Sequence, residues 1–208
     1  MKLIGMLDSP FVRRVAISMR LLGLPFEHGA ISVFRGFDAF QSINPVVKAP
    51  TLICDDGSVL MDSTLMLVYA EALAGRSLMP SAPTELVREL RLIGLALAAC
   101  EKTAQIVYER GLRPAEKRHQ PWVERVTGQL NAAYRELDDE LRGAMLDASE
   151  ANLRQSGITV GVAWTFTQCL LPEVVPADGF PQLVAHALAV ESLPVFQAIP
   201  CDDGVQLS

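Results

Sequence analysis

Residues 44–63 read NPVVKAPTLICDDGSVLMDS and decide how the first part of the chain is organised. Two short apolar runs, at residues 51–54 and 58–61, flank an Asp-Asp-Gly sequence that is typical of a hairpin turn. The Asp-Ser pair at residues 62–63 supplies side chains that favour the start of a helix, and Gly75 favours its end. This stretch therefore predicts a β-hairpin that leads directly into a helix.

The residues before this hairpin alternate between strand and helix patterns. The apolar run at residues 2–6 is suited to a buried strand. Asp-Ser-Pro at residues 8–10 places a capping side chain before a proline at the first helical position, and apolar residues follow at helical spacing up to Gly23. A second strand is predicted within residues 26–33, and residues 35–44 are predicted to be irregular or a short helix. The predicted order is βαβαββα, an α/β domain.

Beyond a proline-containing linker at residues 76–84, the chain shows only helical patterns. The pattern at residues 159–171 is apolar nearly all round, as expected of a helix buried at the centre of a domain. We expect one domain over residues 1–80 and an all-helical domain over residues 81–208. The helices of the second domain are predicted at residues 84–110, 122–148, 159–171 and 182–190.

The composition argues against several classes of protein. The net charge of −6 disfavours a nucleic-acid surface. No apolar run approaches the roughly 18 to 20 residues that span a bilayer, and no signal peptide is evident, so a soluble, cytoplasmic protein that does not bind membranes is expected. The 4 cysteines form no CxxC pair and the 3 histidines stand alone, which favours free thiols and argues against a metal site.

Three short blocks in the first domain resemble motifs of the glutathione transferase superfamily. Ser-Pro-Phe-Val-Arg-Arg at residues 9–14 resembles the C-P-F-x-x-R motif of the glutaredoxin-like and omega-type members, with Ser9 in place of the cysteine. Residues 44–52 resemble the N-P-x-x-K-V-P-x-L stretch of the family, and the pair at residues 62–63 resembles its acidic-Ser pair. The three blocks occur in the family's order and on the expected elements.

The resemblance implies the glutathione transferase fold: a thioredoxin-like domain that binds reduced glutathione, followed by an all-helical bundle that shapes a second substrate pocket. It implies a homodimeric transferase that conjugates glutathione, its co-substrate, to a small hydrophobic electrophile, as in detoxification. Two other functions stay open, namely a non-catalytic glutathione-binding or interaction protein and a glutathione-dependent lyase or isomerase. A serine cannot form a mixed disulfide, so Ser9 argues against thiol-transfer chemistry.

Ser9 is the candidate catalytic residue. The thiolate is the nucleophilic form of glutathione, so an enzyme of this kind must lower the pKa of the bound thiol. A hydroxyl at a helix N-terminus, beside unpaired N–H groups and the positive end of the helix dipole, can donate a hydrogen bond to that thiolate. The alternative is that Ser9 is only the N-cap of its helix.

The resemblance also assigns the groups that hold glutathione. Pro50 resembles the family's cis-proline, and a cis Ala49–Pro50 bond would expose the Ala49 backbone to the cysteinyl part of the tripeptide. A trans proline at a strand start is the alternative. Ser63 is expected to receive the γ-glutamyl carboxylate and Asp62 the ammonium group, with plain helix capping as the alternative. Lys48 is expected to meet the glycyl carboxylate, or else serves surface solubility. The remaining candidates for this site are Phe11 and Arg35.

The second-substrate pocket is predicted from apolar residues, because these suit an apolar electrophile. Tyr108 is the strongest candidate, since its hydroxyl can face a pocket. Simple packing between the domains is the alternative for each residue. The full set of candidates is Leu7, Cys100, Val107, Tyr108 and Trp164.

Two further sequence features are ambiguous or incomplete. Arg14 fits an arginine position of the family better than Arg13 does. It raises the local positive potential, or braces its helix against the second domain, or serves as a structural salt-bridge partner. Thr159 lies where the family often begins a Ser/Thr-x-x-Asp helix cap. Val162 replaces the aspartate, so half of that reciprocal cap is expected to be lost.

Overall fold

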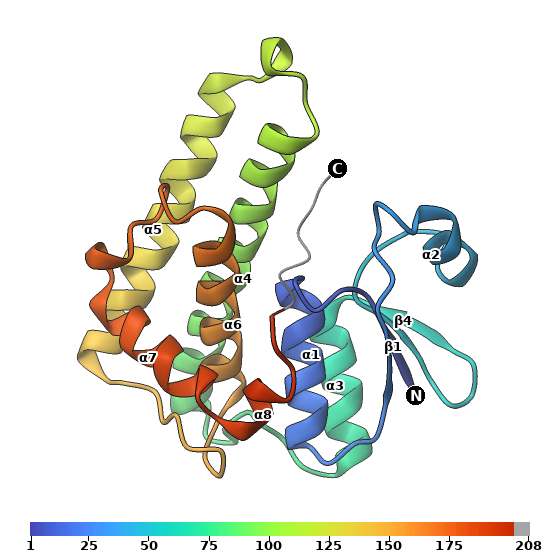
Figure 1. Cartoon of the computed structure of the whole chain (residues 1–208). Helices are drawn as coiled ribbons and strands as arrows, with labels where there is room; N and C mark the ends of the chain where they lie inside the picture. The colour runs from blue at the N-terminus through green and yellow to red at the C-terminus, as the bar shows by residue number, and fades with distance from the viewer. Residues whose placement is uncertain (202–208) are drawn as a thin grey trace. The chain divides into compact units, whose positions relative to one another are not determined.

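A computed structural model describes residues 1–201 of the chain (Figure 1). The chain divides into two compact units, Met1–Leu78 together with residues 194–201, and Met79–Leu193. No helix within the described residues is both long enough and apolar enough to cross a membrane.

The first unit is built on a mixed sheet, which within residues 1–201 has four strands in the order β2-β1-β3-β4. The central strand β1 pairs in parallel with β2 and antiparallel with β3, so that Leu3 lies opposite both His28 and Leu52. Leu3 and Leu52 are fully buried and anchor the core of this unit. The strands are β1 (Lys2–Ile4), β2 (Glu27–Gly29), β3 (Thr51–Ile53) and β4 (Val59–Met61).

Helices α1 (Pro10–Leu21), α2 (Phe37–Ile43) and α3 (Ser63–Ala74) complete the first unit. The predicted order βαβαββα is therefore confirmed. Local signals set the ends of two helices: Pro10 is the first residue of α1, and Gly75 ends α3 with a φ of 63°, where a glycine carries no Cβ penalty. Helices α1 and α3 pack against each other, and α1 buries its apolar residues from Val12 to Met19.

The last described segment, residues 194–201, belongs to the first unit. It includes the short helix α8 (Pro194–Gln197), which contacts α1. Arg13 of α1 donates from Nε to the Ile199 carbonyl at 2.9 Å, and its guanidinium lies 5.4 Å from the centre of the Phe196 ring. Residues up to 201 were expected in the all-helical domain. They lie here because a buried arginine needs both an acceptor and a covering surface.

The second unit consists of packed helices: α4 (Pro83–Gly111), α5 (Gln120–Gly143), α6 (Gln155–Leu170) and α7 (Pro181–Glu191), with 3₁₀ turns at Ala115–Lys117 and Ala177–Gly179. Figure 1 shows α4 beside α5 and α6, and α7 contacts both α5 and α6. Helix α6 is buried over nearly its whole length, as its apolar pattern predicted. The α/β domain followed by a helical domain, the expected fold class, is thus confirmed.

The predicted cap at Thr159 is wrong. Helix α6 begins at Gln155, so Thr159 lies inside the helix, where its hydroxyl donates to the Gln155 carbonyl at 2.7 Å. The acceptor at the helix start comes from another helix, because Glu89 of α4 accepts from the Ser156 N–H at 2.7 Å. A buried carboxylate therefore replaces the local cap, and it satisfies a group that would otherwise lack a partner.

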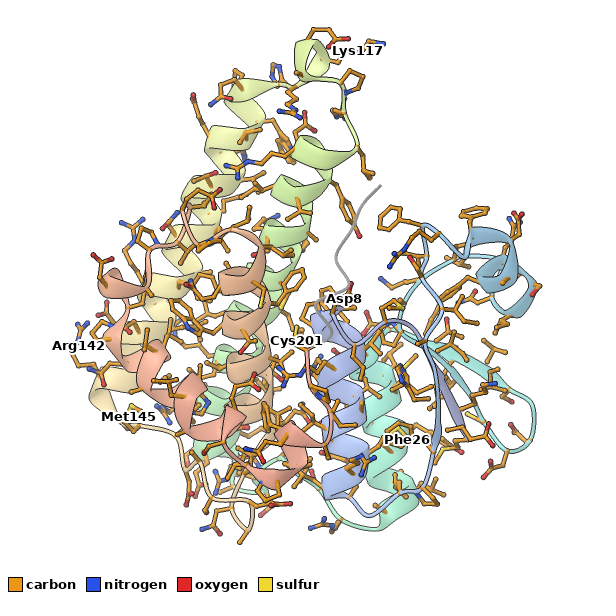
Figure 2. All side chains as sticks on the ribbon, viewed as in Figure 1. Asp8, Phe26, Lys117, Arg142, Met145 and Cys201 are labelled. Carbon is orange, nitrogen blue, oxygen red and sulfur yellow. The ribbon has the colours of Figure 1, made fainter. Side chains whose placement is uncertain are left out.

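Helix α7 is capped in the same way. Asp138 of α5 accepts from the N–H groups of Gln182 and Leu183 at 2.9 and 3.1 Å. Its other oxygen accepts from Arg142 at 2.9 Å, and Figure 2 labels Arg142 on the last turn of α5. Two helix starts in this unit thus depend on buried acidic residues of neighbouring helices.

Replacing Glu89 by Ala should lower the free energy of unfolding by about 1 to 3 kcal/mol, because the Ser156 N–H loses its acceptor in a buried place. Glu85→Ala is the matched control, since Glu85 lies one turn earlier on α4 and forms an exposed ion pair with Arg154. That control should cost less than about 1 kcal/mol. Urea unfolding followed by circular dichroism measures both, and equal losses would contradict the assigned cap.

His186 should make stability depend on pH. Its Nε2 donates to the Gly157 carbonyl at 3.0 Å, while Nδ1 is buried without a partner in the described chain. Burial lowers the pKa of His186 below its ordinary value of 6.5, so the unfolded state binds the proton more readily. Stability is therefore full above about pH 6.5 and falls as the pH drops below it, by at most about 1.4 kcal/mol per pH unit.

The measurement is the free energy of unfolding between neutral pH and pH 5, compared for the wild type and His186→Gln. The substitution should flatten the slope, because it removes the group that must gain a proton. An equal slope in wild type and His186→Gln would assign the pH dependence elsewhere.

Candidate functional site

Ser9 lies at the start of α1, and its hydroxyl forms no capping hydrogen bond. It occupies the N-cap position with φ −70° and ψ 121°, yet its side chain accepts no hydrogen bond from the first turn. The hydroxyl has no other hydrogen-bond partner among residues 1–201, and the residue is partly exposed. The alternative that Ser9 serves only as a cap is therefore not supported, because the bond that defines a cap is missing.

Hydrogen bonds of two buried side chains, Asn44 and Thr51, stabilise the loop before β3. Asn44 is 4% exposed; its Nδ2 donates to Thr51 Oγ1 at 2.8 Å, and its Oδ1 accepts from the Val46 N–H at 3.0 Å. Thr51 Oγ1 in turn donates to the Lys48 carbonyl at 2.8 Å. These bonds connect both ends of the loop, so the conformation of its backbone does not depend on a bound ligand.

The Ala49–Pro50 peptide bond is cis, as predicted from the resemblance. Within the part of the chain that the structure describes, neither the N–H nor the carbonyl of Ala49 forms a hydrogen bond. The residue is partly exposed, so these two groups are available to a peptide lying alongside.

Gly5 lets this loop approach the start of α1, and the sequence analysis missed it. Its φ is +137°, and a Cβ at this position would lie 2.6 Å from Val12 and 3.2 Å from the Ala49 side chain. The Gly5 carbonyl also lies 2.8 Å from Nε2 of His28 on β2. Only a residue without a side chain fits between α1 and the Ala49 loop, and a glycine inside the strand predicted at residues 2–6 was the available signal.

Asp62 and Ser63 form the start of α3. Asp62 is the N-cap, and its Oδ1 accepts from the Thr64 N–H at 2.9 Å. Its φ of 70° is unusual for a residue other than glycine, and such backbone strain is often retained at functional sites. Ser63 is 3% exposed and lies at the first helical position. The capping alternative is thus correct for one oxygen of Asp62, while its second oxygen has no hydrogen bond within residues 1–201.

Arg14 reaches the same helix start from α1. Its Nη1 donates to Ser63 Oγ at 3.1 Å and to Thr64 Oγ1 at 3.3 Å, and the residue is 2% exposed. The sequence analysis offered a general positive potential, a brace or a salt bridge for this residue. The hydroxyl partners on α3 were not foreseen, because they lie far from Arg14 in the sequence.

The other predicted glutathione contacts lie at the surface of the same unit. Lys48 is exposed, and its ammonium group forms no ion pair in the described part of the chain. Arg35 is exposed just before α2, and Phe11 is half-buried in the first turn of α1. Their roles in ligand binding stay predictions.

The candidates for the second pocket differ in how much surface they offer. Trp164 is 4% exposed and packs within its own unit, with its ring 5.2 Å from that of Tyr134 and 5.7 Å from that of Phe180. Cys100 and Leu7 are also buried. Val107 is half-buried and Tyr108 is exposed, so these two offer a ligand the most surface. Within residues 1–201, no group of three or more His, Cys, Asp or Glu side chains is arranged to hold a metal ion.

Comparison with known proteins agrees with this arrangement. Residues 3–78 match the family described as glutathione S-transferase, N-terminal domain. The uncharacterized GST-like protein YibF of Escherichia coli is 26% identical over 165 residues, which cover 79% of this chain and 81% of that protein. Glutathione S-transferase U4 of Arabidopsis thaliana is 31% identical over 85 residues, 40% of this chain and 38% of that protein.

Solved structures share the fold over nearly the whole chain. A glutathione S-transferase from Methylobacterium radiotolerans, in complex with glutathione sulfonate, is 22% identical with a TM-score of 0.87, covering 99% of this chain and 97% of that one. A glutathione transferase family member from Pseudomonas fluorescens, with bound glutathione, is 25% identical with a TM-score of 0.79, covering 95% and 97%. Residues 3–78 thus match the N-terminal domain of the glutathione S-transferase family, and the chain shares the fold of these solved structures.

Proposed function

We propose that the protein is a glutathione transferase: it binds reduced glutathione on its first unit, stabilises the thiolate and adds it to a small hydrophobic electrophile. The observation that carries the proposal is the Ser9 hydroxyl, which stands at a helix N-terminus without a partner within residues 1–201. The similar P. fluorescens protein, a glutathione transferase family member, was solved with glutathione bound.

The thiolate is stabilised where Ser9 and α1 meet. A hydroxyl that caps nothing is free to donate to sulfur, and the first N–H groups of α1 add the positive end of the helix dipole. A hydrogen bond to a charged group contributes about 1.5 to 3 kcal/mol, which corresponds to roughly one to two pKa units of the thiol. The thiolate formed in this way attacks the electrophile, so glutathione supplies the nucleophile.

The tripeptide lies along the loop that ends at Pro50. The N–H and carbonyl of Ala49 pair with the cysteinyl residue as an added strand would, which satisfies two backbone groups of the protein and two of the ligand. Lys48 and Arg35, which lies just before α2, bind the glycyl carboxylate. Phe11 packs on the ligand from the first turn of α1. Ser63 and Asp62 receive the carboxylate and the ammonium of the γ-glutamyl end.

The electrophile contacts Tyr108 and Val107 on α4 of the helical unit. Tyr108 is 43% exposed and combines an apolar ring with a hydroxyl, which suits a mostly apolar molecule with a polar leaving group. The setting is the cytoplasm, since all four cysteines of the chain are free thiols, as a reducing compartment maintains them.

Ser9→Ala should raise the pKa of the bound glutathione thiol by roughly one to two units and lower turnover about tenfold to a hundredfold at neutral pH. The measurements are the ultraviolet absorbance of the bound thiolate against pH and conjugation with a panel of electrophiles. Ser9→Thr keeps a hydroxyl and should retain most of the activity.

Binding is followed separately by thermal shift in millimolar glutathione, because a ligand of the native state raises the melting temperature. Unchanged turnover and thiol pKa in Ser9→Ala would remove the catalytic assignment. Binding without turnover of any electrophile would favour the non-catalytic role, and turnover that consumes no glutathione would favour a lyase or isomerase.

We further propose a homodimer formed through α3 and β4. Four apolar side chains there, Met61, Leu65, Val68 and Leu73, are 40 to 65% exposed in the described chain. Large apolar side chains exposed on two elements that contact each other suit a self-complementary interface with two-fold symmetry.

Val68→Glu should convert the dimer into a monomer, because it introduces two charges into an apolar interface. The measurement is the molar mass in solution by light scattering after gel filtration. Leu188→Glu on α7, equally exposed and outside this surface, is the control and should stay dimeric. A monomeric wild type would overturn the proposal.

A further inference from the structure

We infer that His28 of β2 is a positioning residue for Ser9: its imidazole binds the Gly5 carbonyl and thereby orients the loop that carries the Ser9 hydroxyl. The inference rests on the proposed function, in which that hydroxyl donates to the thiolate of glutathione. His28 contacts no ligand in this role but acts through the backbone between β1 and α1.

The first argument is the hydrogen-bond ladder between β1 and β2. The strands are parallel, with Ile4 opposite Gly29, and the Gly5 N–H extends the ladder by donating to the Gly29 carbonyl at 3.0 Å. The bond pattern of a parallel ladder makes the Ile31 N–H the next donor, with the Gly5 carbonyl as its acceptor. The Ile31 N–H instead donates to the Gly29 carbonyl at 2.9 Å. The ladder therefore ends without a backbone donor for the Gly5 carbonyl.

His28 supplies the missing donor from its side chain. Its Nε2 lies 2.8 Å from the Gly5 carbonyl oxygen. A carbonyl oxygen only accepts, so Nε2 carries a proton and donates it. Both hydrogen-bonding groups of Gly5 are thus bound to consecutive residues of β2, the N–H to the Gly29 carbonyl and the carbonyl to the His28 ring. Because these bonds lie on either side of the Gly5 Cα, they restrict both of its backbone dihedral angles.

The second argument is the conformation of Gly5. Its φ of +137° is accessible almost only to glycine, and glycine is the residue whose backbone is least restricted by its own atoms. A glycine between a strand and a helix would leave the direction of the following residues variable. Hydrogen bonds from a neighbouring strand remove that freedom, and the bond from His28 is the one that sets the orientation of the Gly5 carbonyl.

The peptide group that His28 binds leads directly into the turn that carries Ser9. The Gly5 carbonyl and the Met6 N–H belong to one planar peptide group. The Met6 carbonyl accepts from the Ser9 N–H at 3.2 Å, and the Ser9 carbonyl accepts from the Arg13 N–H at 2.9 Å. The orientation of this peptide group is therefore passed through one turn to the residue whose hydroxyl is proposed to face the thiol.

Glu27 provides a matched control on the same strand. It is also exposed, and its side chain forms no hydrogen bond or ion pair within residues 1–201. Successive side chains point to opposite faces of a strand, so Glu27 and His28 lie on different faces of β2. A change at Glu27 thus perturbs β2 without removing the contact with Gly5.

The experiment compares the wild type with His28→Phe, which keeps a ring but no donor, with His28→Gln, which keeps a donor but no ring, and with Glu27→Gln. Turnover is measured at saturating glutathione, and the pKa of the bound thiol is measured from thiolate absorbance against pH. Calorimetry measures the affinity for γ-glutamyl-2-aminobutyryl-glycine, in which a methyl group replaces the thiol.

His28→Phe should lower turnover about twofold to tenfold and raise the pKa of the bound thiol, because one hydrogen bond that orients the Ser9 loop is lost. It should leave the affinity for the thiol-free peptide nearly unchanged. His28→Gln and Glu27→Gln should retain nearly the wild-type turnover. In a Ser9→Ala background, His28→Phe should have little further effect on turnover, because His28 acts through that hydroxyl.

The outcomes separate the inference from its premise. A wild type that binds no glutathione would overturn the proposed function and the inference with it. Glutathione binding with unchanged turnover in Ser9→Ala would remove the role of Ser9 on which His28 depends. Where both hold, wild-type turnover in His28→Phe, an equal loss in His28→Gln, or an equal loss of affinity for the thiol-free peptide would overturn the role of His28 alone.

Discussion

The start of an α-helix leaves N–H groups without partners in the helix, and the structure treats this constraint differently in its two units. In the helical unit, the starts of α6 and α7 are closed by the buried carboxylates of Glu89 and Asp138. In the first unit, Ser9 caps nothing, and Asp62 satisfies only one N–H of α3. The same physical requirement is met by neighbouring helices in the helical unit and is left partly unmet in the first unit, where we propose that glutathione binds.

The first unit also separates two roles between neighbouring arginines. Arg13 and Arg14 are consecutive on α1 and both are buried, yet one binds the carbonyl of the last described segment and the other binds hydroxyls of α3. Burying a guanidinium is costly unless its donors are used, so each residue fixes the element that it contacts. The Arg14 contacts add to the packing of α1 against α3, which carries the proposed γ-glutamyl site.

In the Ala49 loop, the backbone groups proposed to bind glutathione form no hydrogen bonds within residues 1–201. Asn44 and Thr51 supply the hydrogen bonds that hold the loop, so the groups of Ala49 are not needed for its stability. Gly5 removes the side chain that would otherwise keep this loop away from α1. The proposed cysteinyl and thiolate contacts thus come from two segments that a single small residue allows to approach.

Local patterns in the sequence determined the order of strands and helices, the helix starts at Pro10 and Ser63, and the family blocks around Ser9, Pro50 and Asp62. These features depend on residues close together in the chain. The tertiary structure decided the cap of α6, which joins residues 67 positions apart, the partners of Arg14, 49 and 50 positions away, and the packing of the last described segment on α1. Such contacts satisfy buried donors and charges, and which acceptor meets which donor is known only once the helices have packed.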